Sequence, residues 1–86
     1  MIEGAHLFIT GANRGLGRAF VQEALARGAA RVYAAARDPA SLDATLALDP
    51  TRVHPVRLDV TQVDACRAAA RDCGDVDVLV NNAGVL

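Results

Sequence analysis

The sequence predicts an α/β fold, a doubly wound parallel sheet with helices on both faces, whose first four strands take the spatial order 3-2-1-4. Short apolar runs alternate with stretches of helical periodicity along the chain, which is typical of parallel strands joined by helices. The third apolar run contains Pro55, and proline in a sheet is largely confined to edge strands. The order 3-2-1-4 also places that strand at an edge, so the two observations agree.

The individual elements follow from the apolar positions and from residues that start or stop helices. The expected strands are 6–10, 31–36, 52–58 and 76–80, and the expected helices are 15–27, 38–48 and 61–73. Gly28 is expected to end the first helix, and Asp38-Pro39 to begin the second. Thr61 and Asp64 resemble a capping box at the start of the third. The residues of the first helix expected to face the sheet are Leu16, Ala19, Phe20, Ala24 and Leu25.

The composition fits one small domain, residues 1–86. Hydrophobic residues make up 52% of the chain and charged residues 22%, which excludes intrinsic disorder. Nine basic residues balance ten acidic ones with no run of like charge, which argues against a nucleic-acid or membrane partner. The chain shows no targeting signal and no bilayer-spanning apolar stretch, so a cytoplasmic protein is expected. Cys66 and Cys73 lie too far apart on one helix for a disulfide, and no metal site is expected.

The glycine-rich segment 10–17 follows the first expected strand and opens the first expected helix. Gly11 permits a tight turn, Gly15 lets a diphosphate approach the backbone, and Gly17 lets the helix pack closely on the strand. The helix N-terminus adds free N–H groups and positive potential for phosphate. The candidate cofactor-binding residues here are Gly11, Asn13, Arg14, Gly15, Leu16 and Gly17. The alternative phosphate-binding turn, the P-loop, needs a lysine, and all nine basic residues are arginine.

The end of the second strand indicates which dinucleotide fits. An acidic residue there would hold the ribose hydroxyls of NAD, whereas this chain has Ala36 followed by Arg37. A neutral residue removes repulsion and a guanidinium binds phosphate through two parallel hydrogen bonds, so NADP is expected in preference to NAD. Arg14 could reach the same phosphate. The alternative is that Arg37 is a solvated loop charge paired with Asp38.

Three motifs together resemble the short-chain dehydrogenase/reductase family, and they cover the whole chain. They are Thr-Gly-x-x-x-Gly-x-Gly at 10–17, Asp59-Val60 after the third strand, and Asn81-Asn82-Ala83-Gly84 after the fourth. The resemblance implies a Rossmann-type domain in which Asp59 meets the adenine amino group beside the Val60 backbone. It also implies that Asn82 helps to hold the strands together, and that the cofactor cleft near the ribose is lined by Asn81, Ala83 and Gly84. The simpler alternatives are a turn or capping role for Asp59 and loop hydrogen bonding for the asparagines.

The same resemblance limits what these residues can do. The family's catalytic serine, Tyr-x-x-x-Lys pair and further asparagine follow the Asn-Asn-Ala-Gly motif, and this chain has no lysine. No catalytic residue is therefore assigned, and Tyr33 is expected to pack in the sheet. The chain is interpreted as the N-terminal cofactor-binding portion of an NADP-preferring oxidoreductase that transfers hydride between nicotinamide and an alcohol or carbonyl substrate.

A non-catalytic NAD(P)-binding module or a truncated gene product is the alternative interpretation. A methyltransferase-like sheet is disfavoured because it explains neither Arg37 nor the asparagine motif. Whether the complete enzyme is a homo-oligomer, and which substrate it takes, stay open. Because the expected order leaves the fourth strand without a neighbour on one side, its apolar edge is expected to be open to other chains.

Overall fold

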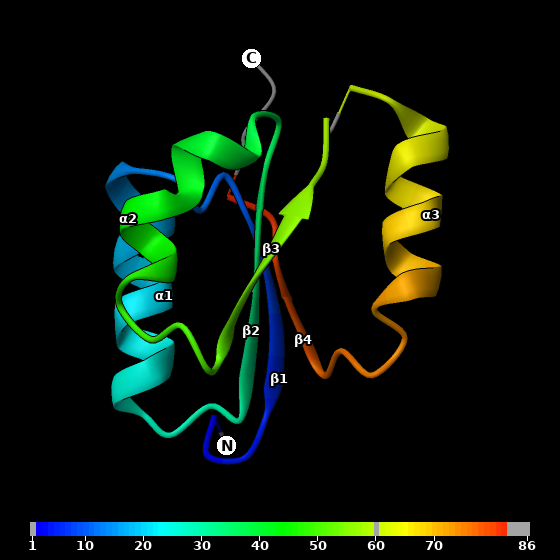
Figure 1. The fold of residues 1–86 in the computed structure, drawn as a ribbon. Coiled ribbons are helices and arrows are strands. Elements are labelled where there is room, and N and C mark those ends of the chain that lie inside the picture. The colour runs from blue at the N-terminus through cyan, green and yellow to red at the C-terminus, as the bar shows by residue number, and fades with distance from the viewer. Residues whose placement is uncertain (1, 60, 83–86) are drawn as a thin grey trace.

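The computed structural model describes residues 2–59 and 61–82 and contains one parallel sheet flanked by helices (Figure 1). Its strands are β1 (His6–Thr10), β2 (Arg31–Ala36), β3 (Val53–Arg57) and β4 (Val78–Val80). Its helices are α1 (Gly15–Ala26), the 3₁₀ helix η1 (Pro39–Leu42), α2 (Asp43–Leu46) and α3 (Val63–Asp72). The spatial order is β3-β2-β1-β4, which confirms the predicted fold class and strand order.

The strand register explains why the proline is accepted. Pro55 lies opposite Ala34 of β2, and β3 is the outermost strand on that side, so the missing N–H removes no bond from a second neighbour. β1 lies in the centre and pairs with both β2 and β4. β4 is shorter than expected and begins at Val78. In the segment that leads into the strand, Asp77 donates its N–H to the His6 carbonyl at 2.8 Å.

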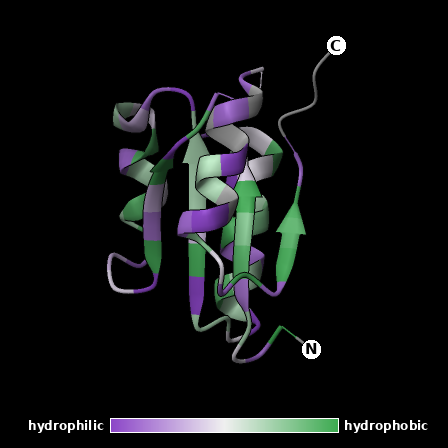
Figure 2. Ribbon diagram, turned by 90° about the vertical axis from the view of Figure 1, so that its right-hand side faces the viewer, coloured by the Kyte–Doolittle hydropathy of each residue, from purple (hydrophilic) through white to green (hydrophobic). Residues whose placement is uncertain are grey.

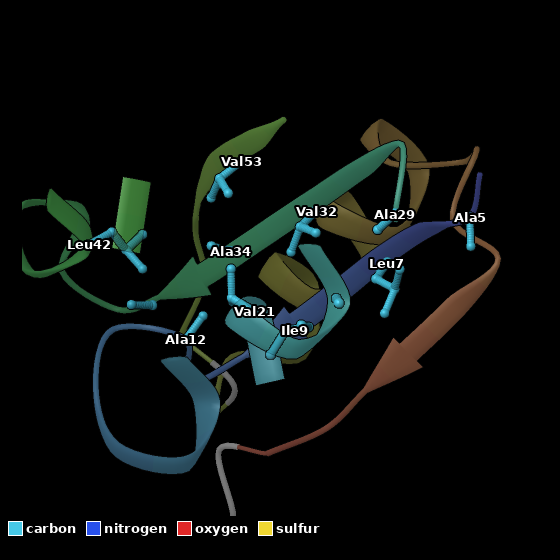
Figure 3. Packing of buried hydrophobic residues seen from close by; sticks show 12 residues of the cluster. Ala5, Leu7, Ile9, Ala12, Val21, Ala29, Val32, Ala34, Leu42 and Val53 are labelled. Atoms are coloured by element: carbon cyan, nitrogen blue, oxygen red, sulfur yellow. The ribbon is translucent and has the colours of Figure 1, made fainter. Parts of the chain in front are cut away.

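Two clusters of buried side chains lie on opposite faces of the sheet. Figure 1 shows α1 and α2 over one face and α3 over the other. The larger cluster, much of it drawn in Figure 3, consists of Ala5, Leu7, Ile9, Ala12, Val21, Ala24, Ala29, Val32, Ala34, Ala36, Leu42 and Val53. The smaller cluster, under α3, consists of Phe8, Ala35, Leu58, Ala69 and Cys73. Burial raises the pKa of the Cys73 thiol, as expected for a packing residue.

The face of α1 that meets the sheet agrees with the predicted one at Ala24 and Leu25 and differs from it elsewhere. Gly17 and Val21 are buried in place of the predicted Leu16, Ala19 and Phe20, which are exposed, Leu16 to 63%. The reason lies at Gly17, where an added Cβ would come within 1.9 Å of the Gly11 carbonyl oxygen. The helix therefore turns its glycine toward β1, and the residues three to four positions further along follow it onto the core face.

The helix ends confirm two of the three predicted signals. Gly28 has φ +87° after α1, and the Asp38 carboxylate accepts the Ala40 N–H at 3.1 Å at the start of η1. The predicted second helix divides into η1 and α2. The capping box at Thr61 is wrong, because α3 begins after Gln62 without a side-chain cap.

When the residues are coloured by hydropathy, the apolar residues are concentrated on the strands (Figure 2). Among the described helices, none has the length and apolar character needed to cross a membrane.

Candidate functional site

The candidate residues gather at one edge of the sheet because they follow the carboxyl ends of parallel strands. The segment Gly11–Gly17, called the glycine turn below, follows β1, and Arg37 follows β2. Asp59 lies beyond β3, and Asn81 directly follows β4. These chain segments lie along the upper edge of the sheet in Figure 1. From β1 the chain adds β2 and β3 on one side and then β4 on the other, so the strand order reverses between β1 and β4. Open α/β sheets bind ligands outside the carboxyl ends of the strands at such a switch point.

The three glycines of the glycine turn meet three different requirements. Gly11 has φ +61° and Gly15 φ +56°, so both occupy the left-handed region that glycine adopts without strain. A Cβ added at Gly15 would meet no atom within 4 Å, which leaves open space above its backbone. Gly17 is the opposite case, since a Cβ there would collide with the Gly11 backbone and approach the Asn82 amide at 2.8 Å. Gly15 thus faces space for a ligand, and Gly17 faces the protein.

The N-terminus of α1 is prepared for an anion. Arg14 is the N-cap residue, no side chain caps the helix, and the first turn carries no acidic residue. The backbone N–H groups of the first turn and the helix dipole therefore face the space beside Gly15 without a protein carboxylate to satisfy them. The side chains of Arg14 and Leu16 are exposed, and that of Asn13 is half-buried. This arrangement fits a bound phosphate or diphosphate.

A second cation lies beyond the end of β2. Arg37 is exposed, and in the part of the chain that the structure describes no ion pair joins it to Asp38. The Asp38 carboxylate instead caps η1 through the Ala40 N–H. The guanidinium of Arg37 is therefore available to an anionic group at the carboxyl edge of the sheet.

Asp59 takes part in a turn at the end of β3. Its Oδ1 accepts the Thr61 N–H at 2.9 Å and the Thr61 hydroxyl at 2.6 Å. These two hydrogen bonds, with a smaller contribution from the charge of Arg37, hold the pKa of the Asp59 carboxyl below its usual range. The carboxylate is therefore ionised at neutral pH and able to accept further hydrogen bonds. The position expected beside it, Val60, lies outside the described residues, as do Ala83 and Gly84.

The asparagines after β4 connect that strand to the glycine turn. The Asn82 N–H donates to the Thr10 hydroxyl at 2.9 Å, and the Asn82 side-chain amide donates to the Gly11 carbonyl at 3.3 Å. The Thr10 hydroxyl in turn lies 3.2 Å from the Asn81 Oδ1. The end of β4 is thus fixed against the same turn that would receive a phosphate.

Two residues that sequence reasoning did not select lie behind the glycine turn. The hydroxyl of Thr45, a residue of α2 that is fully buried, donates to the Ala12 carbonyl at 2.7 Å. Arg18 of α1 donates from Nε to the Thr45 hydroxyl at 3.3 Å and from Nη2 to the Asn13 carbonyl. No local pattern marks either residue, because their contacts depend on how α1 and α2 pack side by side on the sheet.

The structure also bears on metal binding and on the position of Tyr33. Within residues 2–59 and 61–82 no group of three or more His, Cys, Asp or Glu side chains is placed to hold a metal ion. Tyr33 lies in β2, where its hydroxyl donates to Asp75 at 2.8 Å and accepts from Arg31 at 3.1 Å. Both partners belong to the segments that begin β2 and lead into β4, away from the glycine turn. Its hydroxyl therefore serves the packing of the sheet.

Comparison with known proteins identifies relatives over the whole chain. The family model described as short chain dehydrogenase matches residues 5–86. The human L-xylulose reductase is 40% identical over 84 residues, which cover 98% of this chain and 34% of that protein. The short chain dehydrogenase pigC of Monascus ruber is 39% identical over 97 residues, covering 99% of this chain and 32% of that protein. The chain therefore spans about a third of the length of these curated relatives.

Solved structures share the fold over the same residues. A short chain dehydrogenase from Burkholderia cenocepacia, crystallised in complex with NADP, superposes with a TM-score of 0.88 at 41% identity. The match covers 99% of this chain and 34% of that one. A metagenomic short-chain oxidoreductase, also in complex with NADP, has a TM-score of 0.80 at 33% identity and covers 96% of this chain and 40% of its own.

Proposed function

The chain belongs to the short-chain dehydrogenase family, and on that premise we propose that it forms the NADP-binding part of an oxidoreductase. The observation that carries the proposal is the open space at Gly15 beside the uncapped N-terminus of α1. That geometry accepts the diphosphate of a dinucleotide without a competing carboxylate. When bound, the nicotinamide would supply the hydride acceptor or donor for an alcohol or carbonyl substrate.

The preference for NADP over NAD rests on the residues after β2. Ala36 is buried and neutral, and Arg37 is an exposed guanidinium without an ion-pair partner among the described residues. A guanidinium at this position favours the 2′-phosphate of NADP, whereas an acidic residue would favour the free ribose hydroxyls of NAD. Arg14 offers a second positive charge from the glycine turn. The two relatives crystallised with NADP are consistent with this assignment.

The remaining cofactor contacts are assigned by position along the carboxyl edge. Asp59 and Val60 would meet the adenine. They follow β3, which lies next to β2 and therefore on the side of β1 where Arg37 would bind the 2′-phosphate. Asn81, Ala83 and Gly84 would lie near the ribose on the nicotinamide side, because β4 is on the other side of β1. The phosphate-binding residues Gly11, Asn13, Arg14, Gly15, Leu16 and Gly17 would lie between them.

These residues bind and orient but are not proposed to perform the chemical step. The sequence holds no lysine, and its one tyrosine is engaged with Asp75. We therefore assign no catalytic residue to residues 1–86 and expect the substrate site and the proton donor in a complete enzyme. A non-catalytic NADP-binding module is the second candidate, favoured by the same lack of lysine. A Tyr-x-x-x-Lys pair in a longer parent protein would exclude that second candidate.

The test is a fluorescence titration with NADPH and NADH. The chain is expected to bind NADPH at least about tenfold more tightly, since a charged pair with a phosphate contributes more than a kilocalorie per mole. Arg37→Asp is expected to reverse the preference by repelling the 2′-phosphate. Arg67→Asp is the matched control, because Arg67 is an exposed residue of α3 on the opposite side of the sheet from α1 and α2. Equal or tighter binding of NADH by the unmodified chain would show the assignment to be wrong.

A further inference from the structure

Side chains from outside the glycine turn donate hydrogen bonds to its backbone carbonyls. Thr45 has no exposed surface, and its hydroxyl both donates to the Ala12 carbonyl at 2.7 Å and accepts from Arg18 Nε at 3.3 Å. Arg18 also donates to the Asn13 carbonyl. A buried hydroxyl is retained at a core position only where its hydrogen bonds offset the cost of removing it from water. Thr45 therefore has a role that an apolar residue of the same size would not fill.

The direction of these bonds determines where the neighbouring N–H groups point. A trans peptide unit carries its C=O and N–H on opposite sides, and no cis peptide bond occurs among the described residues. Because the Ala12 carbonyl is drawn toward α2, the N–H of Asn13 on the same peptide unit points away from it. Because the Asn13 carbonyl is drawn toward Arg18, the N–H of Arg14 likewise points away. Neither N–H has a backbone acceptor among the described residues.

Ala12 is also fixed through the peptide unit that precedes it. Its N–H donates to the Ala35 carbonyl at the end of β2 at 3.1 Å, and its side chain is completely buried. Ala12 thus connects the glycine turn to β2 through its N–H and to α2 through its carbonyl. The turn cannot rotate its peptide planes without breaking one of these bonds, so its free N–H groups are oriented before any ligand arrives.

We propose that Thr45 and Arg18 are positioning residues for dinucleotide binding, which hold the Ala12 and Asn13 carbonyls inward so that the Asn13 and Arg14 N–H groups face the phosphate. The proposal rests on the proposed function, since the ligand is the dinucleotide. It adds that a short helix outside the phosphate-binding segment contributes to cofactor affinity through the backbone of the turn alone. No side chain of α2 needs to touch the cofactor for this effect.

The test compares Thr45→Val with Thr45→Ser. Valine has the same shape but leaves the Ala12 carbonyl and the Arg18 Nε without their partner, so the NADPH dissociation constant is expected to rise about tenfold. Serine keeps the hydroxyl and is expected to restore binding to within about threefold of the parent. The matched control is Thr51→Val, because Thr51 is exposed just before β3, at the opposite edge of the parallel sheet from the glycine turn. Dissociation constants are compared at a temperature at which circular dichroism shows each variant folded, which separates positioning from a loss of stability.

Amide hydrogen exchange of the ligand-free chain provides a readout that does not depend on the cofactor. Thr45→Val is expected to accelerate exchange at Ala12, whose N–H is hydrogen-bonded to the Ala35 carbonyl, while β1 and β3 keep their protection. Should the valine variant fail to fold, Arg18→Gln replaces it, and faster exchange of the same amide is expected. Unchanged exchange at the turn, or NADPH binding by folded Thr45→Val within twofold of the parent, would overturn the proposal. If the parent binds no dinucleotide at all, the proposed function fails, while the exchange data still decide whether Thr45 orders the turn.

Discussion

Two glycines two positions apart in the chain have opposite surroundings, which separates binding from folding at the scale of single residues. Gly15 has φ +56° and no atom within 4 Å of an added Cβ, whereas a Cβ at Gly17 would lie 1.9 Å from the Gly11 carbonyl oxygen. A side chain at Gly15 would enter the space proposed for the diphosphate. A side chain at Gly17 would displace α1 from β1.

Gly15→Val is accordingly expected to abolish dinucleotide binding while the sheet still assembles. The left-handed backbone adds a strain of about 1–2 kcal/mol, which lowers stability without removing any core contact. Gly17→Ala is the comparison, and it is expected to lower the free energy of unfolding and to lose binding as a consequence. Urea unfolding and NADPH titration of both variants measure the two effects. A folded Gly15→Val protein that keeps its NADPH affinity would contradict the phosphate-binding role of the turn.

At the scale of elements, the segment before β4 is tied to the starts of β1 and β2. The Asp75 carboxylate accepts the Tyr33 hydroxyl at 2.8 Å and lies 2.6 Å from His6 Nδ1 and 3.7 Å from Arg31. The Asp77 carboxylate accepts the His6 backbone N–H at 2.9 Å. These contacts fix where β4 begins against β1, and therefore where the asparagines at its other end arrive. β4 itself is only three residues long.

The Asp75 cluster predicts a definite dependence of stability on pH. The Tyr33 hydroxyl first, and then His6, hold the pKa of Asp75 below its ordinary value of 3.8. A carboxyl with a lowered folded pKa contributes stability above its unfolded pKa and loses it as the pH falls through the folded value. Asp75→Asn is therefore expected to be less stable than the parent at pH 7, and the difference is expected to shrink below roughly pH 4.

Thermal unfolding of both proteins between neutral and acid pH measures this effect. Asp72→Asn is the control, because Asp72 is an exposed residue at the end of α3 without a described hydrogen bond to its side chain. A constant difference between Asp75→Asn and the parent across the whole range would mean that the carboxylate charge contributes nothing to stability.

The sequence predicts the elements well where local signals determine them and fails where packing does. Strands 6–10 and 31–36 are found with the expected bounds, since each is an apolar run delimited by glycine or polar residues. The face of α1 is predicted correctly at Ala24 and Leu25 but wrongly at Leu16 and Phe20. The core position belongs instead to Gly17, whose contribution is its lack of a side chain. A hydrophobic pattern gives no weight to a glycine that permits close approach.

The candidate site shows the same division. The positions of the glycine turn and Arg37 at one edge could be predicted, because residues that follow parallel strands gather there. Their roles in cofactor binding stay predictions. The Asp59 hydrogen bonds to Thr61 correct the expected capping box, because the carboxylate two residues before Thr61 competes successfully for its hydroxyl. Thr45 and Arg18 could not be found, since their contacts join positions 27 residues apart through the packing of two helices.

At the scale of the whole molecule, the two edge strands of the sheet differ in how well they are protected from pairing with other chains. The edge strand β3 contains Pro55, which opposes such pairing, whereas the edge strand β4 consists only of apolar residues. Val78 and Val80 pack against the larger cluster under α1, but Leu79, which pairs with Phe8 on the α3 face, is 66% exposed. Figure 2 shows β4 as a hydrophobic strand at the outside of the sheet. Open apolar edge strands pair with other chains unless they are charged or covered.

The chain by itself is therefore expected to be marginally stable and to associate through β4. The free energy of unfolding of a chain of this size is small, so the burial lost at an uncovered edge is a large fraction of it. Size-exclusion chromatography over a range of concentrations is expected to show self-association of the parent. Leu79→Lys is expected to shift the chain toward the monomer, because a charged residue on an edge strand opposes pairing with another chain. Leu48→Lys is the matched control, since Leu48 is also exposed but follows α2, away from β4. A parent chain that elutes as a monomer at every concentration and unfolds sharply at high temperature would show instead that these four strands form a self-sufficient domain.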